Sequence, residues 1–172
     1  MNAGRVAFAL LVAGLTLEAC AQNATDVVQW SAKPESTQAV RAGQKIAASL
    51  DARIDTGWHV YSITQAPGGP TKSEISVPAN QPFKLAGVVI GPQPESAYDP
   101  NFEMKTEFYE KTAGFKVPLA VVASAKPGET TGTIDVLFQT CTDRICLPAT
   151  TAHVPLTVMI ASGGSKRPTA KP

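Results

Sequence analysis

The sequence predicts an all-β protein, folded as an antiparallel β-sandwich, and three observations lead to this prediction. Apolar and polar residues alternate along several short segments, which is the pattern of a strand with one buried face. Clusters of proline and glycine at residues 67–70, 91–94 and 126–128 separate these segments and favour turns. No stretch of comparable length in the body of the chain has the spacing of an amphipathic helix.

Five segments carry the strand prediction. Residues 46–54 alternate between apolar side chains and residues that are polar except for Ala47. Residues 83–90 and 115–122 are apolar enough to be core strands, and residues 134–138 and 154–160 return to the alternating pattern. Many short strands between turns indicate a sandwich, and no internal repeat is visible.

The two ends of the chain differ in composition from its body. Residues 1–21 have a basic start, a 12-residue apolar run and a small-x-small pattern ending at Ala21, which predicts an export signal. That run is short of the ~20 residues that span a bilayer. Alternatively, Leu17 to Cys20 is similar to a lipoprotein signal that would end before Cys20 and leave it acylated, although Glu18 is unusual there. Both interpretations predict an exported protein, with one domain over residues 22–161 and a disordered tail over residues 162–172.

Charge and motif content exclude several classes of function. The formal net charge is +1, from 15 basic and 14 acidic residues without a block of like charge, so the chain is not expected to bind nucleic acid or anionic lipid. His59 and His153 form no recognisable metal-ligand set with the cysteines. There is no Gly-x-Ser-x-Gly elbow and no phosphate-binding glycine loop. We therefore expect no metal, no cofactor and no conventional hydrolase chemistry.

Two closely spaced cysteines are the clearest candidate for chemistry. Cys141 follows the predicted strand 134–138, and Cys146 lies five residues later, before the predicted strand 154–160. A bond across such a short loop would stabilise the fold by only about 2 kcal/mol in the chain-entropy model, which makes it a weak structural staple. It suits a bond that opens and closes without unfolding the domain. The spacing alone leaves both a redox-active pair and a structural disulfide open.

Three segments resemble the periplasmic N-terminal domain of DsbD-type thiol:disulfide interchange proteins. Residues 136–148 carry the cysteine pair and are followed by Val-Pro-Leu, residues 106–111 read Thr-Glu-Phe-Tyr-Glu-Lys, and residues 57–61 read Gly-Trp-His-Val-Tyr. Their order and separation make the resemblance specific, and it covers residues 27–160. It implies an immunoglobulin-like fold, in agreement with the strand prediction.

The resemblance also implies roles for particular residues. Cys141 and Cys146 would be the dithiol–disulfide couple, with Cys146 forming the intermolecular bond and Cys141 resolving it. Glu107, Phe108 and Tyr109 would belong to a cap loop over the pair, and Tyr61 and His59 would line the site. A ring over the disulfide would exclude small thiols by its bulk. Without the resemblance, Phe108 and Tyr109 would be interpreted as core residues.

This chain departs from the family pattern at two positions near the pair. His59 stands where a tyrosine is expected and Thr106 where an acidic residue is expected. A histidine there could act as a base near neutral pH, or it could be a partly exposed strand residue without a role in chemistry.

The resemblance implies partners but does not choose among them. As an N-terminal module alone, a protein-disulfide reductase or interchange component, the chain would take electrons from a thioredoxin-like protein or a DsbD- or CcdA-type membrane reductase. It would pass them to oxidised periplasmic thiol proteins such as disulfide isomerases, cytochrome c maturation factors or metallochaperones. The alternative is a non-catalytic envelope adaptor or binding module with a structural disulfide.

Overall fold

The computed structural model describes residues 22–162 and confirms the all-β prediction. The predicted export signal with Cys20 and all but the first residue of the predicted tail lie outside the described residues. One four-residue helix precedes eleven strands. Their bounds are α1 Ala24–Val27, β1 Val28–Pro34, β2 Lys45–Ile54, β3 His59–Tyr61, β4 Glu74–Ser76, β5 Phe83–Leu85, β6 Glu95–Asp99, β7 Met104–Glu110, β8 Thr112–Val121, β9 Gly128–Phe138, β10 Thr140–Cys141 and β11 Thr150–Ile160.

The first layer of the sandwich is a four-stranded antiparallel sheet in the order β1-β2-β8-β5. β2 supplies the alternation that the sequence predicts, because Leu50, Ala52 and Ile54 are buried while Asp51 and Arg53 between them are not. β8 lies antiparallel to it, with Leu50 opposite Phe115. This register brings buried side chains of both strands onto one face.

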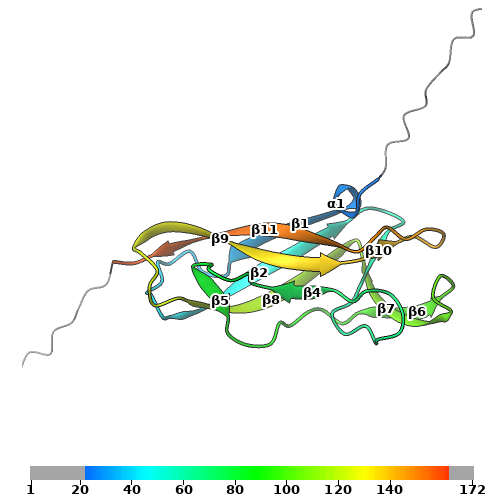
Figure 1. Cartoon of the computed structure of the whole chain (residues 1–172), viewed down its shortest axis with the longest axis horizontal. Coiled ribbons are helices and arrows are strands. Elements are labelled where there is room, and N and C mark those ends of the chain that lie inside the picture. Colours follow the sequence, from blue (N-terminus) through cyan, green and yellow to red (C-terminus); the bar gives the residue numbers. More distant parts are fainter. Residues whose placement is uncertain (1–21, 163–172) are drawn as a thin grey trace, which may run out of the picture.

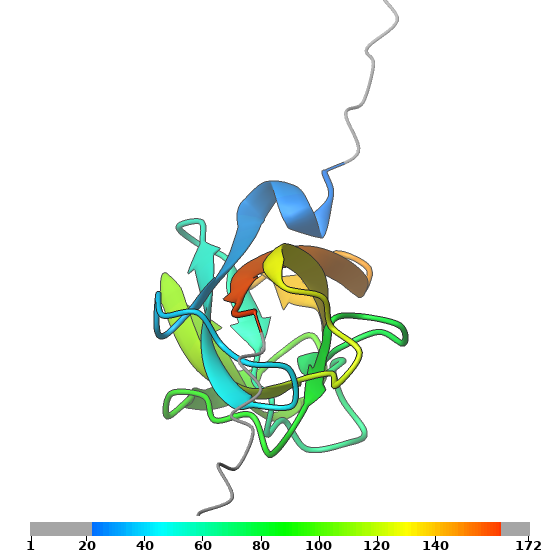
Figure 2. The same cartoon turned by 90° about the vertical axis from the view of Figure 1, so that its left-hand side faces the viewer.

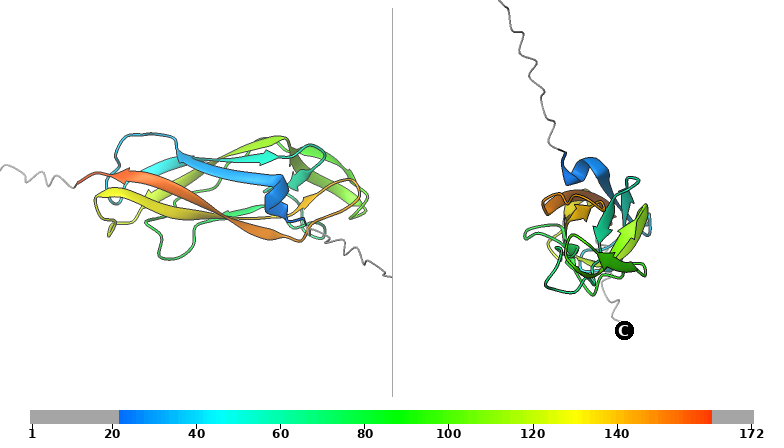
Figure 3. Two further views of the ribbon diagram at one scale, coloured as in Figure 1. Left: turned by 90° about the horizontal axis from the view of Figure 1, so that it is seen from above. Right: turned by 90° about the vertical axis from the view of Figure 1, so that its right-hand side faces the viewer.

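The second layer is a three-stranded antiparallel sheet in the order β11-β9-β4. β9 and β11 pair over eleven residues each, from Thr150 opposite Phe138 to Ile160 opposite Gly128. Seen from above, β1 and β11 run next to each other along one side of the sandwich (Figure 3, left).

The core lies between the two layers, which the end-on view separates (Figure 2). The indole of Trp30 on β1 reaches across to Phe138 on β9, with ring centroids 5.6 Å apart. Gly132 on β9 faces Phe83 on β5 so closely that a Cβ at this glycine would lie 2.6 Å from the ring. The two sheets are therefore packed at the separation of a close-packed interior.

The connectivity is that of an immunoglobulin constant-type sandwich. In that fold the sheets have the strand orders A-B-E-D and C-F-G. Here β1, β2, β8 and β5 occupy the first order, and β4, β9 and β11 occupy the second. The immunoglobulin-like antiparallel β-sandwich predicted from the sequence is confirmed.

A third sheet is added to one end of the sandwich. Its order is β10-β3-β7-β6, and it is built from the connections between β2 and β4, between β5 and β8, and between β9 and β11. These strands gather at the right-hand end of the molecule in Figure 1 and face the viewer in the right-hand panel of Figure 3. The cysteine pair belongs to this sheet.

Four of the five predicted strand segments are confirmed, and one is wrong in part. Residues 46–54, 115–122, 134–138 and 154–160 correspond to β2, β8, β9 and β11. Of residues 83–90, only Phe83–Leu85 form a strand. Val88 is 84% exposed and Ile90 is 64% exposed, because this stretch runs along the open edge of the first sheet, where its backbone bonds to β8 only at Ala86 and Ile90.

No helix among residues 22–162 is long and apolar enough to cross a membrane.

Candidate redox site

Cys141 and Cys146 form a disulfide at the edge of the third sheet where β10 lies. Cys141 ends β10, and the two cysteines pair as an antiparallel bridge with their Cα atoms 4.1 Å apart. The four residues between them, 142–145, make the turn. The bond thus joins the two arms of a short hairpin directly next to its turn.

The turn of this hairpin has hydrogen bonds of its own. The Thr142 amide donates to the Ile145 carbonyl over 2.8 Å, and the Thr142 Oγ1 accepts from the Ile145 amide over 3.1 Å. Beyond the disulfide, the Leu147 amide donates to the Thr140 carbonyl over 3.0 Å. Because backbone bonds close the hairpin on both sides of the disulfide, its shape does not depend on the sulfur–sulfur bond alone.

The two cysteines differ in exposure. Cys141 has no exposed surface, whereas Cys146 is partly exposed. Ile145, beside Cys146, is 52% exposed. An incoming thiol or disulfide therefore meets Cys146 first.

Strand register places a group of side chains on the same face as Cys141. Cys141 lies directly opposite His59 on β3, and His59 lies opposite Glu110 on β7. Two residues further along β3, Tyr61 lies opposite Phe108 on β7. Directly paired residues point to the same side of a sheet, so these side chains form two adjacent rows beside the disulfide.

His59 is the residue that links the disulfide to the aromatic rings. Its ring centroid lies 5.0 Å from that of Phe108 and 5.1 Å from that of Tyr61. Its Nε2 is buried and has no hydrogen-bond partner. Burial lowers the pKa of His59, while the carboxylates of Asp99, Glu110 and Asp143 act in the opposite direction.

A small cavity of about 80 Å³ lies beside this group. Its lining combines side chains of three strands with the turn of the cysteine hairpin, among them His59, Asp99, Phe108, Glu110 and Asp143. Three of these five carry a carboxylate, so the cavity is an acidic environment for the imidazole.

A chain of hydrogen bonds runs from the sheet to the cysteine hairpin. The Tyr61 hydroxyl donates to the Asp99 Oδ2 over 2.6 Å, and the Asp99 Oδ1 accepts from the Asn101 amide over 2.8 Å. The Asn101 Nδ2 donates to the Thr142 carbonyl over 3.3 Å. Burial, together with the bond to Asp99, raises the pKa of Tyr61 far above its ordinary value, so the phenol stays protonated.

The structure brings some of the expected site residues to the pair and separates others from it. His59, Tyr61 and Phe108 share the face of Cys141. Glu107 and Tyr109 project from the other face of β7. Tyr109 packs on Phe115 with centroids 5.5 Å apart, as a core residue.

Hydrogen bonds likewise hold the Glu107 side chain away from the disulfide. Its Oε2 accepts hydrogen bonds from the Thr64 Oγ1 over 2.6 Å and the Ser62 Oγ over 3.3 Å. The expectation of a loop over residues 106–111 also needs correction, since residues up to Glu110 belong to β7. A turn does approach the cysteines, but it is the one between β6 and β7, where Asn101 lies.

Asp99, Asn101 and Glu110 are site residues that the sequence does not reveal. Asp99 and Asn101 flank Pro100, an Asp-Pro-Asn sequence that is typical of a turn and carries no sign of chemistry. Glu110 ends a strand and could have been found only from its register against His59.

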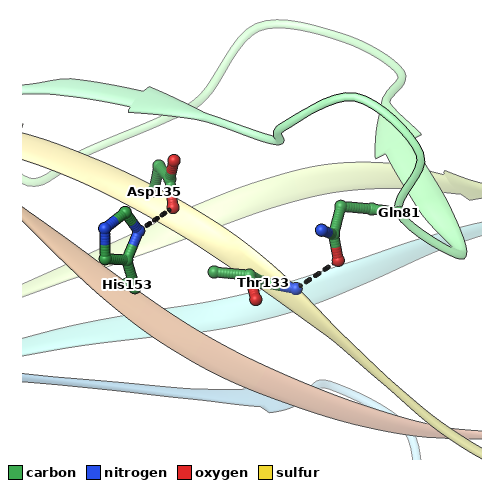
Figure 4. Close-up of polar contacts among 4 residues, drawn as sticks. All are labelled: Gln81, Thr133, Asp135 and His153. Atoms are coloured by element: carbon green, nitrogen blue, oxygen red, sulfur yellow. Dashed lines mark hydrogen bonds and ion pairs between the residues drawn. The ribbon is translucent and has the colours of Figure 1, made fainter.

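The second histidine lies on a different sheet. Figure 4 shows His153 on β11 beside Asp135 on β9, with Nδ1 and Oδ1 2.7 Å apart, and the Gln81 side chain accepting from the Thr133 amide over 2.9 Å. The His153 side chain is 70% exposed. Within residues 22–162, no three His, Cys, Asp or Glu side chains are grouped so that they could hold a metal ion.

Fold and site together define an immunoglobulin-like sandwich that carries a surface disulfide in an added end sheet. The family model described as "Thiol:disulfide interchange protein DsbD, N-terminal" matches residues 28–158, which include all eleven strands except the end of β11. The chain belongs to this family. No curated protein sequence matches it.

Two solved structures are among those that match this chain. The reduced N-terminal domain of DsbD from Neisseria meningitidis is 16% identical, with a TM-score of 0.43, covering 72% of this chain and 82% of that one. The N-terminal periplasmic domain of ScsB from Proteus mirabilis is 20% identical, with a TM-score of 0.49, covering 76% of this chain and 46% of that one.

Proposed function

We propose that this chain is a periplasmic thiol–disulfide exchange module that passes electrons from a reductase to oxidised proteins through the Cys141–Cys146 couple. The observation that carries the proposal is the unequal exposure of the pair within one hairpin, with Cys146 accessible and Cys141 buried beside it. Membership of the DsbD N-terminal family supports the same chemistry.

The exchange proceeds in two steps that balance without a cofactor. In the reduced protein, the Cys146 thiolate attacks one sulfur of a client disulfide, which forms a mixed disulfide and releases the first client thiolate. The Cys141 thiolate then attacks the Sγ of Cys146, which re-forms the Cys141–Cys146 bond and releases the second client thiolate. Two electrons pass to the client, and the two thiol protons end on its sulfurs or in water.

Phe108 is proposed to restrict access to the pair. Its ring packs on His59, the residue directly opposite Cys141, and lines the cavity that reaches the cysteine hairpin. A side chain in this position limits the approach of small thiols by its bulk, and a docking protein could displace it. Glu107 and Tyr109 support β7 from its other face instead of covering the disulfide.

The partners follow from the direction of electron flow that the family implies. A thioredoxin-like protein or a DsbD- or CcdA-type membrane reductase would reduce the pair, and oxidised periplasmic thiol proteins would receive the electrons. Export by a signal ending at Ala21, or anchoring through an acylated Cys20, stays a prediction from the sequence, as does the division into a domain over residues 22–161 and a tail.

Trapping of mixed disulfides tests the proposal. Cys141→Ala removes the resolving thiol, so Cys146 should remain bonded to its partners and give adducts in periplasmic extracts that a reductant releases. Cys146→Ala is the matched control and should give far fewer. If Cys141→Ala gives no more adducts than Cys146→Ala, the pair does not exchange in this way, and the disulfide is a structural part of a binding module.

A further inference from the structure

We propose that His59 accepts the thiol proton of Cys141 during exchange and holds the resulting thiolate as an imidazolium–thiolate pair. The inference rests on the proposed function, because it assigns a proton acceptor to the resolving step of that reaction. The sequence leaves open whether His59 acts as a base, and neither the cysteine spacing nor the family resemblance indicates which group it would deprotonate.

Strand register places the two groups together. His59 and Cys141 are direct partners in the β3–β10 ladder. Side chains of directly opposed residues in an antiparallel pair have Cβ atoms about 4.5–5.5 Å apart and point to the same face. The side-chain hydroxyl of Thr140 fixes this register further by donating to the His59 carbonyl over 2.7 Å.

The imidazole is free to take a proton. Its Nε2 is buried without a hydrogen-bond partner, which is an unfavourable state for a polar atom unless the atom has another use. Since burial lowers the pKa of His59, the ring is neutral at neutral pH and can act as a base.

The surroundings favour the imidazolium once it has formed. Carboxylates face the ring from each element packed around it: Asp99 from β6, Glu110 from β7 and Asp143 from the cysteine hairpin. The remaining titratable neighbour is Tyr61, a protonated phenol bonded to Asp99, and Arg144 on the same hairpin is exposed to solvent. A positive charge on His59 would thus lie among negative ones.

Cys141 needs such a partner more than Cys146 does. It has no exposed surface, so water cannot stabilise its thiolate, and burial disfavours the charged form. In the resolving step the proton leaves the Cys141 sulfur for Nε2 of His59, and the thiolate attacks the Sγ of Cys146. The bond between Cys146 and the client breaks, and the proton then passes from His59 to the departing client thiolate or to water.

The test is the titration of Cys141 as a single thiol. In the full chain with Cys20→Ser and Cys146→Ser, Cys141 is the one remaining cysteine of three, and the ultraviolet absorbance of the thiolate reports its ionisation. Adding His59→Gln should raise the pKa of Cys141 and lower the thiolate fraction at neutral pH about tenfold, the equivalent of one pKa unit. His153→Gln is the matched control and should leave the titration unchanged.

Further measurements guard against a misfolded variant. His59→Tyr keeps an aromatic ring against Phe108 but cannot carry a positive charge, so it should reproduce the effect of His59→Gln. In the unmodified chain, NMR titration of the imidazole should show a higher pKa for His59 in the reduced form than in the oxidised form. The proposal is overturned if the Cys141 titration is the same in all variants or if the imidazole titrates identically in both redox forms.

The outcomes separate this inference from the proposed function. Normal mixed disulfides with an unchanged Cys141 titration would leave exchange intact and remove His59 from it. A shifted titration without mixed disulfides would establish the pairing of the two side chains and contradict the exchange function.

Discussion

The hydroxyl of Tyr61 donates a 2.6 Å hydrogen bond to the carboxylate of Asp99, and this contact joins β3 to the end of β6. Tyr61 is fully buried, and Asp99 is 6% exposed. Asp99 in turn accepts from the backbone of the β6–β7 turn, whose Asn101 donates to the cysteine hairpin. The bond thus positions the turn that lies beside the disulfide.

Tyr61→Phe should destabilise the protein by about 1.5–3 kcal/mol, the range for a hydrogen bond to a charged group. The loss arises because the buried Asp99 Oδ2 loses its tyrosine donor while the ring still fills its place. Equilibrium unfolding in urea measures it. Tyr98→Phe is the control, since Tyr98 is 66% exposed. Equal stability of the two variants would show that the Tyr61–Asp99 bond does not stabilise the fold.

Phe108→Ala should speed reduction of the disulfide by dithiothreitol about tenfold, which corresponds to removing about 1.4 kcal/mol of barrier. The ring packs on His59 opposite Cys141, so its loss opens the approach to the pair. Stopped-flow or quenched alkylation gives the rate. Met159→Ala, at a 46% exposed position on β11, should react like the parent protein. An unchanged rate in Phe108→Ala would show that the ring does not shield the bond.

The stability of the oxidised protein should fall as the pH is lowered through the range in which His59 titrates. Its pKa in the folded protein is lowered by burial from the ordinary 6.5, so the unfolded chain binds a proton more readily than the folded one. Stability is therefore complete above about pH 6.5 and decreases as the pH falls toward the lower folded value. Thermal unfolding at several pH values above those at which carboxylates titrate measures the slope.

His59→Gln should flatten this pH dependence, because the group that titrates is gone. His153→Gln, which removes the exposed histidine beside Asp135, is the comparison. If the dependence of stability on pH survives in His59→Gln and disappears in His153→Gln, the effect belongs to His153 and the prediction is contradicted.

Gly132→Ala should destabilise the sandwich by about 1–3 kcal/mol through overpacking. The added methyl would lie 2.6 Å from the Phe83 ring and 2.8 Å from Pro82, so the two sheets would have to shift. Glu129→Ala, at an exposed position of the same strand, is the control for urea unfolding. Equal midpoints for the two variants would mean that the interface between β9 and β5 is loosely packed.

The sandwich could be predicted from the sequence because its main strands are long and carry a period of two. β2 and β9 bury every second residue, and a pattern of that length is specific. β1 has the same signal in Val28, Trp30 and Ala32 and could have been found in the same way. The prediction of a core strand through Val88 is wrong because apolar composition alone does not distinguish a core strand from an open edge.

The site could be predicted only in part, for a reason of register. Cys141 and Cys146 are near neighbours in the sequence, so their pairing is visible there. The pairing of Cys141 with His59 in the strand register, and the approach of Asp99 and Glu110, depend on how β10, β3, β7 and β6 align, which local sequence does not encode. The resemblance implies a cap loop for the Glu-Phe-Tyr segment, whereas the segment lies in β7, where strand alternation places Phe108 on one face and its two neighbours on the other.

The reduction potential of the Cys141–Cys146 couple tests the central claim most directly. Free thiols are alkylated across a series of redox buffers, and the products are weighed. An exchange module should give a value of about −180 to −270 mV, the range of known exchange proteins. A value below about −300 mV would mark a structural bond that the surroundings do not reduce, and would contradict the proposed function.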